Sequence, residues 1–373
     1  AKAKELDIPI FSFPEFIYQN ARNKQRLVIA GSHGKTTITS MVMHVLKFWD
    51  RKFDYVVGAK TEGFDTSVKL SDAPVIVIEG DEYASSALDK RPKILNYQHH
   101  IGIMNGISWD HINLFKSEDD YVKQFELFAD ASPKAGALIF NEEDDLTTVI
   151  CRKERQDVQQ LEYGTHPYEV IDGKFYLIAD NEKIPVNLIG RHNMININAA
   201  RTLLNRISIK DDQFYEAIRT FEGASKRLEI IAKTDSSIVF RDYAHSPSKV
   251  AASVNAVREM YPDRKLIACL ELHTFSSLNK NFISHYQTTL DDADLAIIYY
   301  NPHAVELKQL EEITIQDIQE RVDHPNLRIF NDSTELFSFL NTIEFRSTNL
   351  LLMSSGNFDN LNFEEIINKA NSI

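Results

Sequence analysis

The chain has 373 residues, of which 43% are hydrophobic and 25% charged, a composition typical of folded globular proteins and not of disordered or collagen-like chains. Because single cores rarely exceed roughly 250–300 residues, the length predicts two α/β units. The formal charge of −13 argues against a general nucleic-acid binder, and the lack of a long apolar run or an export signal predicts a cytoplasmic protein without membrane insertion.

Helices and strands alternate along the first part of the chain. A helix is expected at 14–20, a buried strand at 27–30 and an apolar-periodic helix at 37–49. Such alternation predicts a mostly parallel sheet. The other elements expected here are strands at 75–79, 101–105 and 137–140, and helices at 119–129, from 190 onward and at 211–221.

A second alternation begins after residue 223 and predicts a smaller doubly wound domain. Its expected elements are strands at 238–241, 266–270, 295–300, 327–330 and 350–353, and a helix at 248–261. The two cysteines, Cys151 and Cys269, are too few for a disulfide framework or a zinc site, so we expect buried thiols.

The strongest motif lies between the strand at 27–30 and the following helix and reads Gly31-Ser32-His33-Gly34-Lys35-Thr36-Thr37. Glycines let backbone N–H groups approach phosphate oxygens, a lysine neutralises the β and γ phosphates, and a threonine hydroxyl can bind Mg²⁺ at the positive end of a helix. Ile29 stands where the common phosphate-loop pattern has its first glycine. The strand and helix on either side still favour ATP or GTP binding.

Two polar segments follow other predicted strands. The run Glu79-Gly80-Asp81-Glu82-Tyr83 places carboxylates at a strand's carboxyl end, where they suit Mg²⁺, although an acidic strand end can also be a solvated loop. The segment Asn105 to His111 follows the strand at 101–105. His111 could be a structural histidine oriented by Asp110, but both segments gain weight beside a phosphate loop.

Four ordered motifs together resemble the central ATPase domain of the Mur ligases. They are the loop at 31–37, Glu79 after its strand, the segment at 105–111, and Gly190-Arg191-His192-Asn193 with Asn196 and Ala199-Ala200. The resemblance continues in Lys226-Arg227-Leu228-Glu229, in Asp242-Tyr243-Ala244-His245-Ser246-Pro247 and in Gly356-Asn357-Phe358. It covers the chain from about residue 6 onward.

The resemblance implies an ATP-dependent ligase that forms C–N bonds and uses ATP and Mg²⁺. ATP would phosphorylate a substrate carboxylate, an amine would attack the acyl phosphate, and phosphate would leave. The implied catalytic residues are Lys35, Glu79 and His111, and Thr36, Glu79 and His111 would hold Mg²⁺. The implied ATP contacts are Gly31, Ser32, His33, Gly34, Lys35, Thr36, Thr37, His192, Asn193, Arg227 and Asp242.

The resemblance also implies an α/β fold in three parts. Residues 1–22 would be the remnant of an N-terminal UDP-binding domain that is largely absent from this sequence. Residues 23–221 would form the central phosphate-loop ATPase domain with a mostly parallel sheet, and residues 222–373 a C-terminal Rossmann-like domain. Closure of the domains would complete the ATP site.

Two kinds of Mur ligase fit the motifs, and both act on UDP-N-acetylmuramate. The acidic segment at 79–83, the stretch 109–115 and the run 353–356 favour one that attaches the peptide L-Ala-D-Glu-diaminopimelate. Tyr243, His245 and His273 resemble residues that bind the incoming amino acid in one that adds L-alanine. The L-alanine ligases typically carry arginines just after the residue that corresponds to His273, where they could bind the carboxylate of the amino acid. Here Thr274, Ser277 and Leu278 occupy that stretch, which argues against simple binding of alanine.

Other classes remain as alternatives. A folate-type polyglutamate ligase shares the architecture, and a phosphate-loop kinase or GTPase shares the nucleotide loop but needs neither the later motifs nor a second Rossmann-like domain. A non-catalytic ATP-binding protein would not need the intact set of Lys35, Thr36, Glu79 and His111. No lysine is clearly placed to carry a carbamate, and Lys123 is a weak candidate. We expect a monomer or homodimer with no nucleic-acid partner.

Overall fold

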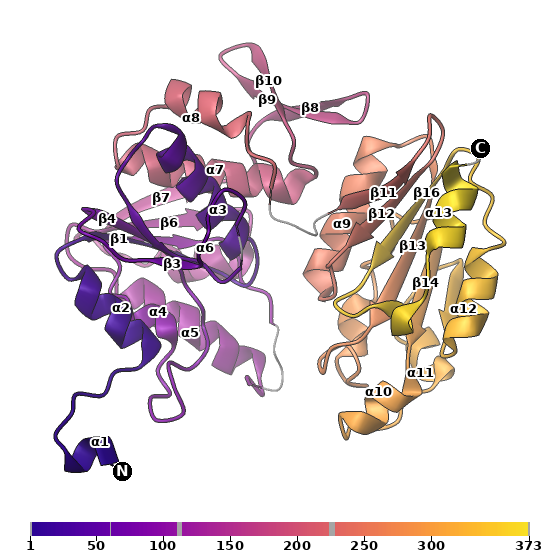
Figure 1. Ribbon diagram of the computed structural model, residues 1–373, viewed down its shortest axis with the longest axis horizontal. Helices are drawn as coiled ribbons and strands as arrows, with labels where there is room; N and C mark the ends of the chain where they lie inside the picture. Colours follow the sequence, from indigo (N-terminus) through magenta and orange to yellow (C-terminus); the bar gives the residue numbers. More distant parts are fainter. Residues whose placement is uncertain (1, 60, 110–113, 224–227, 372–373) are drawn as a thin grey trace.

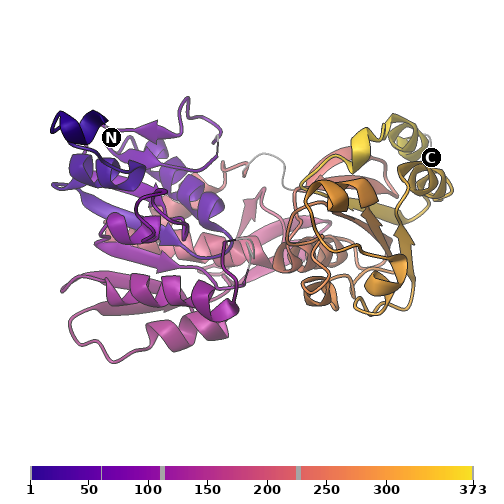
Figure 2. The same cartoon turned by 90° about the horizontal axis from the view of Figure 1, so that it is seen from below.

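The computed structural model describes residues 2–59, 61–109, 114–223 and 228–371, which form two α/β halves (Figure 1). A seven-stranded sheet organises the first half and a six-stranded sheet the second. The two halves lie side by side when the molecule is seen from below (Figure 2). None of the helices in the described ranges is long and apolar enough to cross a membrane.

The first sheet is parallel except at one edge. Its strands are β1 (Gln25–Ala30), β2 (Asp54–Val56), β3 (Val68–Lys69), β4 (Val75–Glu79), β5 (Ile101–Met104), β6 (Ala137–Asn141) and β7 (Gln159–Tyr163). Their order is β3-β2-β4-β1-β5-β6-β7, and only β3 is antiparallel to its neighbour. The carboxyl ends of β4, β1 and β5 therefore meet at one edge, where parallel sheets usually bind ligands.

Helices cover both faces of this sheet, and successive side chains of β1 enter two different cores. Leu27 and Ile29 pack in one core, whereas Val28 and Ala30 pack in the other, as a strand's period of two requires. The first face carries α3 (Lys35–Phe48), α7 (Arg191–Arg206) and α8 (Asp211–Ile218). The second face carries α2 (Phe13–Ala21), α4 (Lys93–Asn96), α5 (Glu118–Asp130) and α6 (Asp145–Cys151), and α1 (Lys2–Glu5) precedes them.

Polar side chains cap several of these helices, but none caps α3. Ser12 forms a capping box with Glu15 at the start of α2, Ser117 accepts the Asp120 N–H of α5, and Asp144 caps α6. The N-cap residue of α3 is Gly34, which has no side chain to cap the helix. Its amino end is therefore suited to bind an anion.

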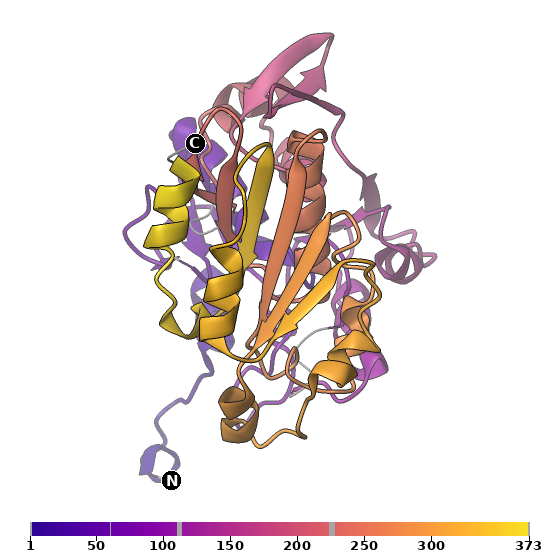
Figure 3. The same cartoon turned by 90° about the vertical axis from the view of Figure 1, so that its right-hand side faces the viewer.

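The second sheet contains five parallel strands and one antiparallel edge strand. Its strands are β11 (Glu229–Lys233), β12 (Ile238–Asp242), β13 (Lys265–Leu272), β14 (Leu295–Tyr300), β15 (Leu327–Phe330) and β16 (Thr348–Met353). Their order is β11-β12-β16-β13-β14-β15, with β11 antiparallel to β12. Figure 3 shows β16, the last strand among the described residues, lying inside this sheet.

Helices also lie on both faces of the second sheet. Helix α9 (Pro247–Met260) packs on the face toward the first half and contacts α7, and α12 (Ser333–Leu340) and α13 (Glu364–Asn371) pack on the other face. The shorter helices are α10 (Pro302–Leu307), α11 (Ile315–Gln319), η1 (Ile283–Tyr286) and η2 (Phe358–Asn360). The α/β fold with mostly parallel sheets is thus as predicted.

A small antiparallel sheet was not predicted. It consists of β8 (Tyr168–Ile171), β9 (Lys174–Ala179) and β10 (Glu182–Val186) in the order β10-β9-β8. Cys151 and Cys269 are buried free thiols, as expected. Residues 224–227 lie outside the described ranges, and the domain boundaries at 22 and 221 stay predictions.

Candidate active site

The phosphate loop joins β1 to α3 and depends on glycine for its shape. Gly31 and Gly34 have φ values of 132° and 78°, which side chains rarely adopt. A Cβ atom at Gly34 would lie 2.2 Å from Asn105 Nδ2 and 2.4 Å from Asn196 Oδ1. The loop therefore presents bare backbone at the start of α3, as phosphate binding requires.

Asn105 holds this loop from the end of β5. Its Nδ2 group donates to the His33 carbonyl and to Asn196 Oδ1, each at 3.0 Å, and its Oδ1 accepts the Tyr163 hydroxyl at 2.6 Å. The resemblance included Asn105 and Asn196 without giving either a role. The structure shows that they tie β5 and α7 to the phosphate loop.

The side chain of Lys35 folds over the phosphate loop, where it pairs with the buried carboxylate of Glu82. Its Nζ donates to the Gly31 carbonyl at 2.5 Å and forms an ion pair with Glu82 at 3.0 Å. Glu82 is only 1% exposed, and the Tyr121 hydroxyl lies 3.1 Å from its other oxygen. Sequence reasoning placed Glu82 in the acidic segment but missed this contact.

Thr36 and Glu79 provide two oxygen ligands beside the loop. The Thr36 hydroxyl donates to Glu79 Oε1 at 2.7 Å, and the Gly58 N–H donates to Oε2 at 2.7 Å. Burial raises the pKa of Glu79, and these two hydrogen bonds oppose the rise. Mg²⁺ is commonly held by one or two protein oxygens together with phosphates and water, so this pair fits the ion.

A cavity of about 120 Å³ lies between the halves, next to the phosphate loop. Asn193 and Asp242, two of the predicted ATP contacts, come from opposite halves to line it. Asn193 donates to the Ile189 carbonyl at 2.8 Å, and Asp242 is 5% exposed. The described residues that line it are His33, Gly34, Thr37, Asn187, Leu188, Ile189, His192, Asn193, Asn196, Glu222, Gly223, Leu228, Asp242, Ser248, Lys249, Ala252 and Ser253.

His33 and Lys249 approach this cavity from opposite sides. The buried Nδ1 atom of His33 has no hydrogen-bond partner among the described residues. Burial lowers the pKa of His33 to about 4, Asp144 opposes the shift, and the charges of Lys249 and Lys35 add to it. The His33 ring is therefore neutral at pH 7. Lys249, in the first turn of α9, was not predicted; its only sequence signal is a cation just after Ser246-Pro247.

The residues predicted to bind the incoming group lie at the carboxyl edge of the second sheet. Tyr243 and His245 follow β12 with their rings 5.2 Å apart, and His273 follows β13 with Nδ1 3.7 Å from Glu271. None of the three lines the cavity between the halves. Their role stays a prediction.

Two predicted site residues, His111 and Arg227, lie outside the described residues. Within the described ranges, no group of three or more His, Cys, Asp or Glu side chains is arranged to hold a metal ion. Lys123 is exposed on α5 and pairs with Glu126 at 2.7 Å. That carboxylate raises the pKa of Lys123, which disfavours the neutral amine needed to form a carbamate.

The loop, its carboxylates and the cavity between two α/β halves are those of a nucleotide-dependent ligase. The profile of the Mur ligase middle domain matches residues 29–204, and that of the Mur ligase, glutamate ligase domain matches residues 226–356. The chain belongs to the Mur ligase family, whose members are ATP-dependent ligases that form C–N bonds in peptidoglycan synthesis.

Two kinds of relative within this family bear on the group that is added. The chain is 28% identical to the UDP-N-acetylmuramate–L-alanine ligase of Sulfurihydrogenibium sp. (strain YO3AOP1), over 96% of this chain and 79% of that protein. The solved UDP-N-acetylmuramate-alanine ligase of Thermotoga maritima has a TM-score of 0.66 and 16% identity, over 100% of this chain and 81% of the other. The UDP-N-acetylmuramate:L-alanyl-gamma-D-glutamyl-meso-diaminopimelate ligase of Neisseria meningitides has a TM-score of 0.53 and 26% identity, over 60% and 75%.

Proposed function

We propose that the chain uses ATP and Mg²⁺ to join the peptide L-Ala-D-Glu-diaminopimelate to the carboxylate of UDP-N-acetylmuramate. One observation supports the ligase chemistry: Lys35, in the phosphate loop, lies next to the hydrogen-bonded Thr36–Glu79 pair at the carboxyl edge of the first sheet. This edge adjoins a cavity lined from both halves of the molecule.

The reaction has two steps. The γ-phosphoryl group passes to a carboxylate oxygen of the sugar acid, giving ADP and an acyl phosphate. The peptide amine then attacks the acyl carbon and loses a proton, and the C–O bond breaks so that inorganic phosphate leaves. Charge builds on the phosphoryl oxygens in the first step, so fixed positive groups near them lower the barrier.

The residues of the loop divide this work. The backbone at Gly31 to Gly34 and the amino end of α3 would bind phosphate oxygens, and Lys35 would exchange Glu82 for the transferring group. Thr36 and Glu79 would hold Mg²⁺, which when bound neutralises phosphate charge. Asn193 and Asp242 would contact the nucleoside from the two sides of the cavity. His111 and Arg227 would complete the site.

The peptide is favoured over alanine by the turn after His273. Thr274 and Ser277 are joined by two hydrogen bonds. Their hydroxyl oxygens lie 3.0 Å apart, and the Ser277 N–H donates to Thr274 Oγ1 at 3.0 Å. Leu278 is fully buried. This turn offers no cation to clamp the carboxylate of a free amino acid.

L-Alanine is the second candidate for the added group. It is favoured by the names of several relatives, among them the UDP-N-acetylmuramate–L-alanine ligase of Sulfurihydrogenibium sp., which is 28% identical to this chain. Both candidates need the same ATP site and the same sugar acid. They differ only in the amine that attacks.

Phosphate release by the full-length protein separates these candidates. The protein is given ATP, Mg²⁺ and UDP-N-acetylmuramate, with the tripeptide or L-alanine supplied separately, and Lys35→Ala serves as the inactive control. Release with the tripeptide alone is expected. Release with alanine alone would replace the peptide proposal, and no release with either would refute both and direct the search to folate-type acceptors or kinase substrates.

A further inference from the structure

The first sheet has a second polar hollow at its amino edge, the end away from the phosphate loop. This amino-edge hollow has a volume of about 530 Å³ and is bordered by the first residues of β1, β5, β6 and β7. Its lining is Arg22, Asn23, Lys24, Gln25, His100, Ile101, Pro133, Lys134, Ala135, Gly136, Ala137, Gln159 and Arg206. The Mur ligase motifs assign no role to it.

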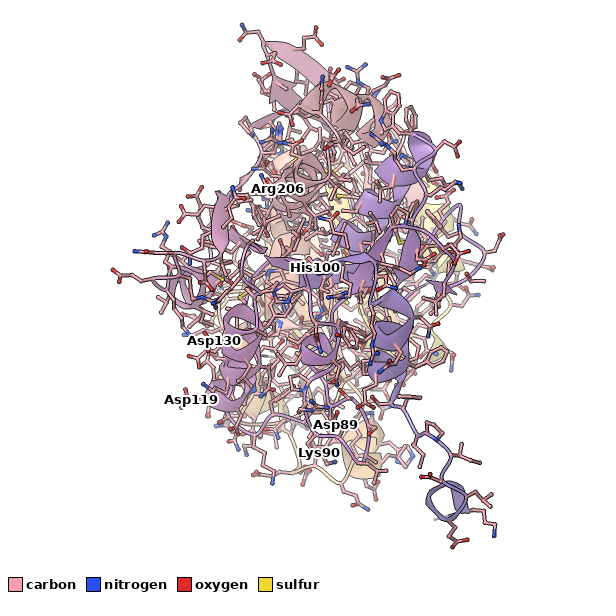
Figure 4. The ribbon with its side chains drawn as sticks, turned by 90° about the vertical axis from the view of Figure 1, so that its left-hand side faces the viewer. Asp89, Lys90, His100, Asp119, Asp130 and Arg206 are labelled. Atoms are coloured by element: carbon pink, nitrogen blue, oxygen red, sulfur yellow. The ribbon has the colours of Figure 1, made fainter. Side chains whose placement is uncertain are left out.

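The charge of the hollow is of one sign, although the chain as a whole is acidic. Arg22, Lys134 and Arg206 are exposed, and none of them forms an ion pair with any described residue. Lys24 is the exception, because it is paired with Asp54. Among the described residues, no aspartate or glutamate lines the hollow. Asp157 interacts electrostatically with Lys134 but is already paired with Arg155, so the hollow keeps a net positive potential. Figure 4 shows Arg206 and His100 on this face of the molecule.

Beside these cations, Arg26 and His100 direct two N–H donors at each other. Arg26 is 6% exposed, and its guanidinium donates to the carbonyls of Gln98 at 2.8 Å and Ala21 at 3.0 Å. The Arg26 backbone N–H donates to His100 Nδ1 at 3.1 Å, which leaves the proton of a neutral ring on Nε2. That Nε2 lies 3.3 Å from Arg26 Nη2, so a donor faces a donor.

Titration of the ring does not remove the conflict. Burial lowers the pKa of His100, and the charge of Arg26 lowers it further. The ring therefore stays neutral at pH 7 with its proton on Nε2. A negatively charged acceptor within reach of both N–H groups would satisfy them together.

We propose that the amino-edge hollow binds a phosphate group. Three cations without an ion pair to any described residue, together with two facing N–H donors, call for a ligand with several acceptor oxygens and about two negative charges. A phosphate has these properties and a single carboxylate lacks them. The site is separate from the proposed ATP site, because β1 runs from the hollow at Gln25 to the phosphate loop after Ala30.

Titration calorimetry with inorganic phosphate tests the proposal on the whole protein. We expect a dissociation constant of about 1 mM or lower, and a value at least about tenfold higher in the double variant Lys134→Ala/Arg206→Ala. Both side chains are exposed, so the variant should fold. The matched control is Lys265→Ala/Arg328→Ala, in a hollow of the second sheet that also contains Asp294.

Lys35→Ala shows which site the phosphate occupies. Phosphate binding should survive Lys35→Ala, and the His100 pKa followed by NMR should rise when phosphate is added, because an anion favours the charged ring. No binding to the wild type, or binding lost only in Lys35→Ala, would overturn the proposal. So would a double variant that is less stable but binds normally, since Arg206, in the last turn of α7, would then serve only the helix end.

Discussion

At the scale of single residues, Glu79 sits where burial opposes its charge. Its folded pKa lies above 4.5, mainly through burial, despite the hydrogen bonds from Gly58 and Thr36. An ionised carboxylate with a raised pKa destabilises the fold at neutral pH, and this loss disappears as the pH falls through the raised value toward 4.5. The buried, ionised Glu79 at the proposed Mg²⁺ site therefore lowers the stability of the fold at neutral pH.

Replacing Glu79 with glutamine should therefore separate stability from activity. The Glu79→Gln variant should be more stable than the wild type at pH 7, because a neutral amide can accept the Gly58 N–H and donate to Thr36. Phosphate release should fall about 100-fold or more as the metal ligand is lost. Urea unfolding at pH 5 and pH 7 provides the check, and a less stable variant at pH 7 would contradict it.

Glu82 has the opposite effect on stability. The Glu82→Gln variant leaves Lys35, whose side chain is 12% exposed, without its ionic partner and should lose about 1–3 kcal/mol of unfolding free energy. Mg²⁺ and ATP should reduce the difference in unfolding free energy between the wild type and Glu82→Gln, since the phosphates would replace the carboxylate as the partner of Lys35. Asp81→Asn is the control, because its ion pair with Lys93 is about a quarter exposed and should contribute below about 1 kcal/mol. If nucleotide left the stability difference between the wild type and Glu82→Gln unchanged, the proposed exchange of Glu82 for phosphate at Lys35 would be contradicted.

At the scale of elements, the phosphate loop is held by side chains from β5 and α7. Gly34→Ala would push a methyl group into the Asn105 and Asn196 amides, so nucleotide affinity should fall at least about 100-fold as the loop shifts. Gly63→Ala is the matched control. Gly63 has a similar φ of 76°, but its Cβ would meet only the flexible end of Lys47. Equal losses of nucleotide binding in the two variants would show that backbone strain, not the amide contacts, shapes the loop.

The sequence predicted those elements whose hydrophobic pattern is strong. Strands β1, β4, β5, β6 and β12 to β16 were found because buried runs such as 27–30 and 350–353 are continuously apolar. Strands β2, β3, β7 and β11 of the same two sheets were not predicted. Strands β8 to β10 were missed because they expose many side chains and include Pro185. The loop and Glu79 were predictable from local motifs, whereas the Lys35–Glu82 pair joins residues 47 positions apart and has no local signature.

At the scale of the whole molecule, the proposed ATP site draws its residues from both halves, and a change at Lys249 tests that proposal. Lys249→Ala should raise the dissociation constant for ATP about tenfold and leave adenosine binding little changed, because it would remove a cation from the phosphates. Lys249→Arg should restore most of the affinity. Lys265→Ala, on the same half but outside the cavity, should bind like the wild type. Equal weakening of ATP and adenosine would place Lys249 at the nucleoside instead.

The order of strands in the two sheets also bears on synthesis of the chain at the ribosome. The seven strands of the first sheet are complete by Tyr163, so that sheet can form while the rest of the chain is being translated. In the second sheet β16 lies between β12 and β13, so residues 348–353 must emerge before those two strands can be joined. The nascent second half therefore exposes two unpaired strand edges until residues 348–353 have emerged, which is the interval in which a chaperone that covers such edges would protect it from aggregation.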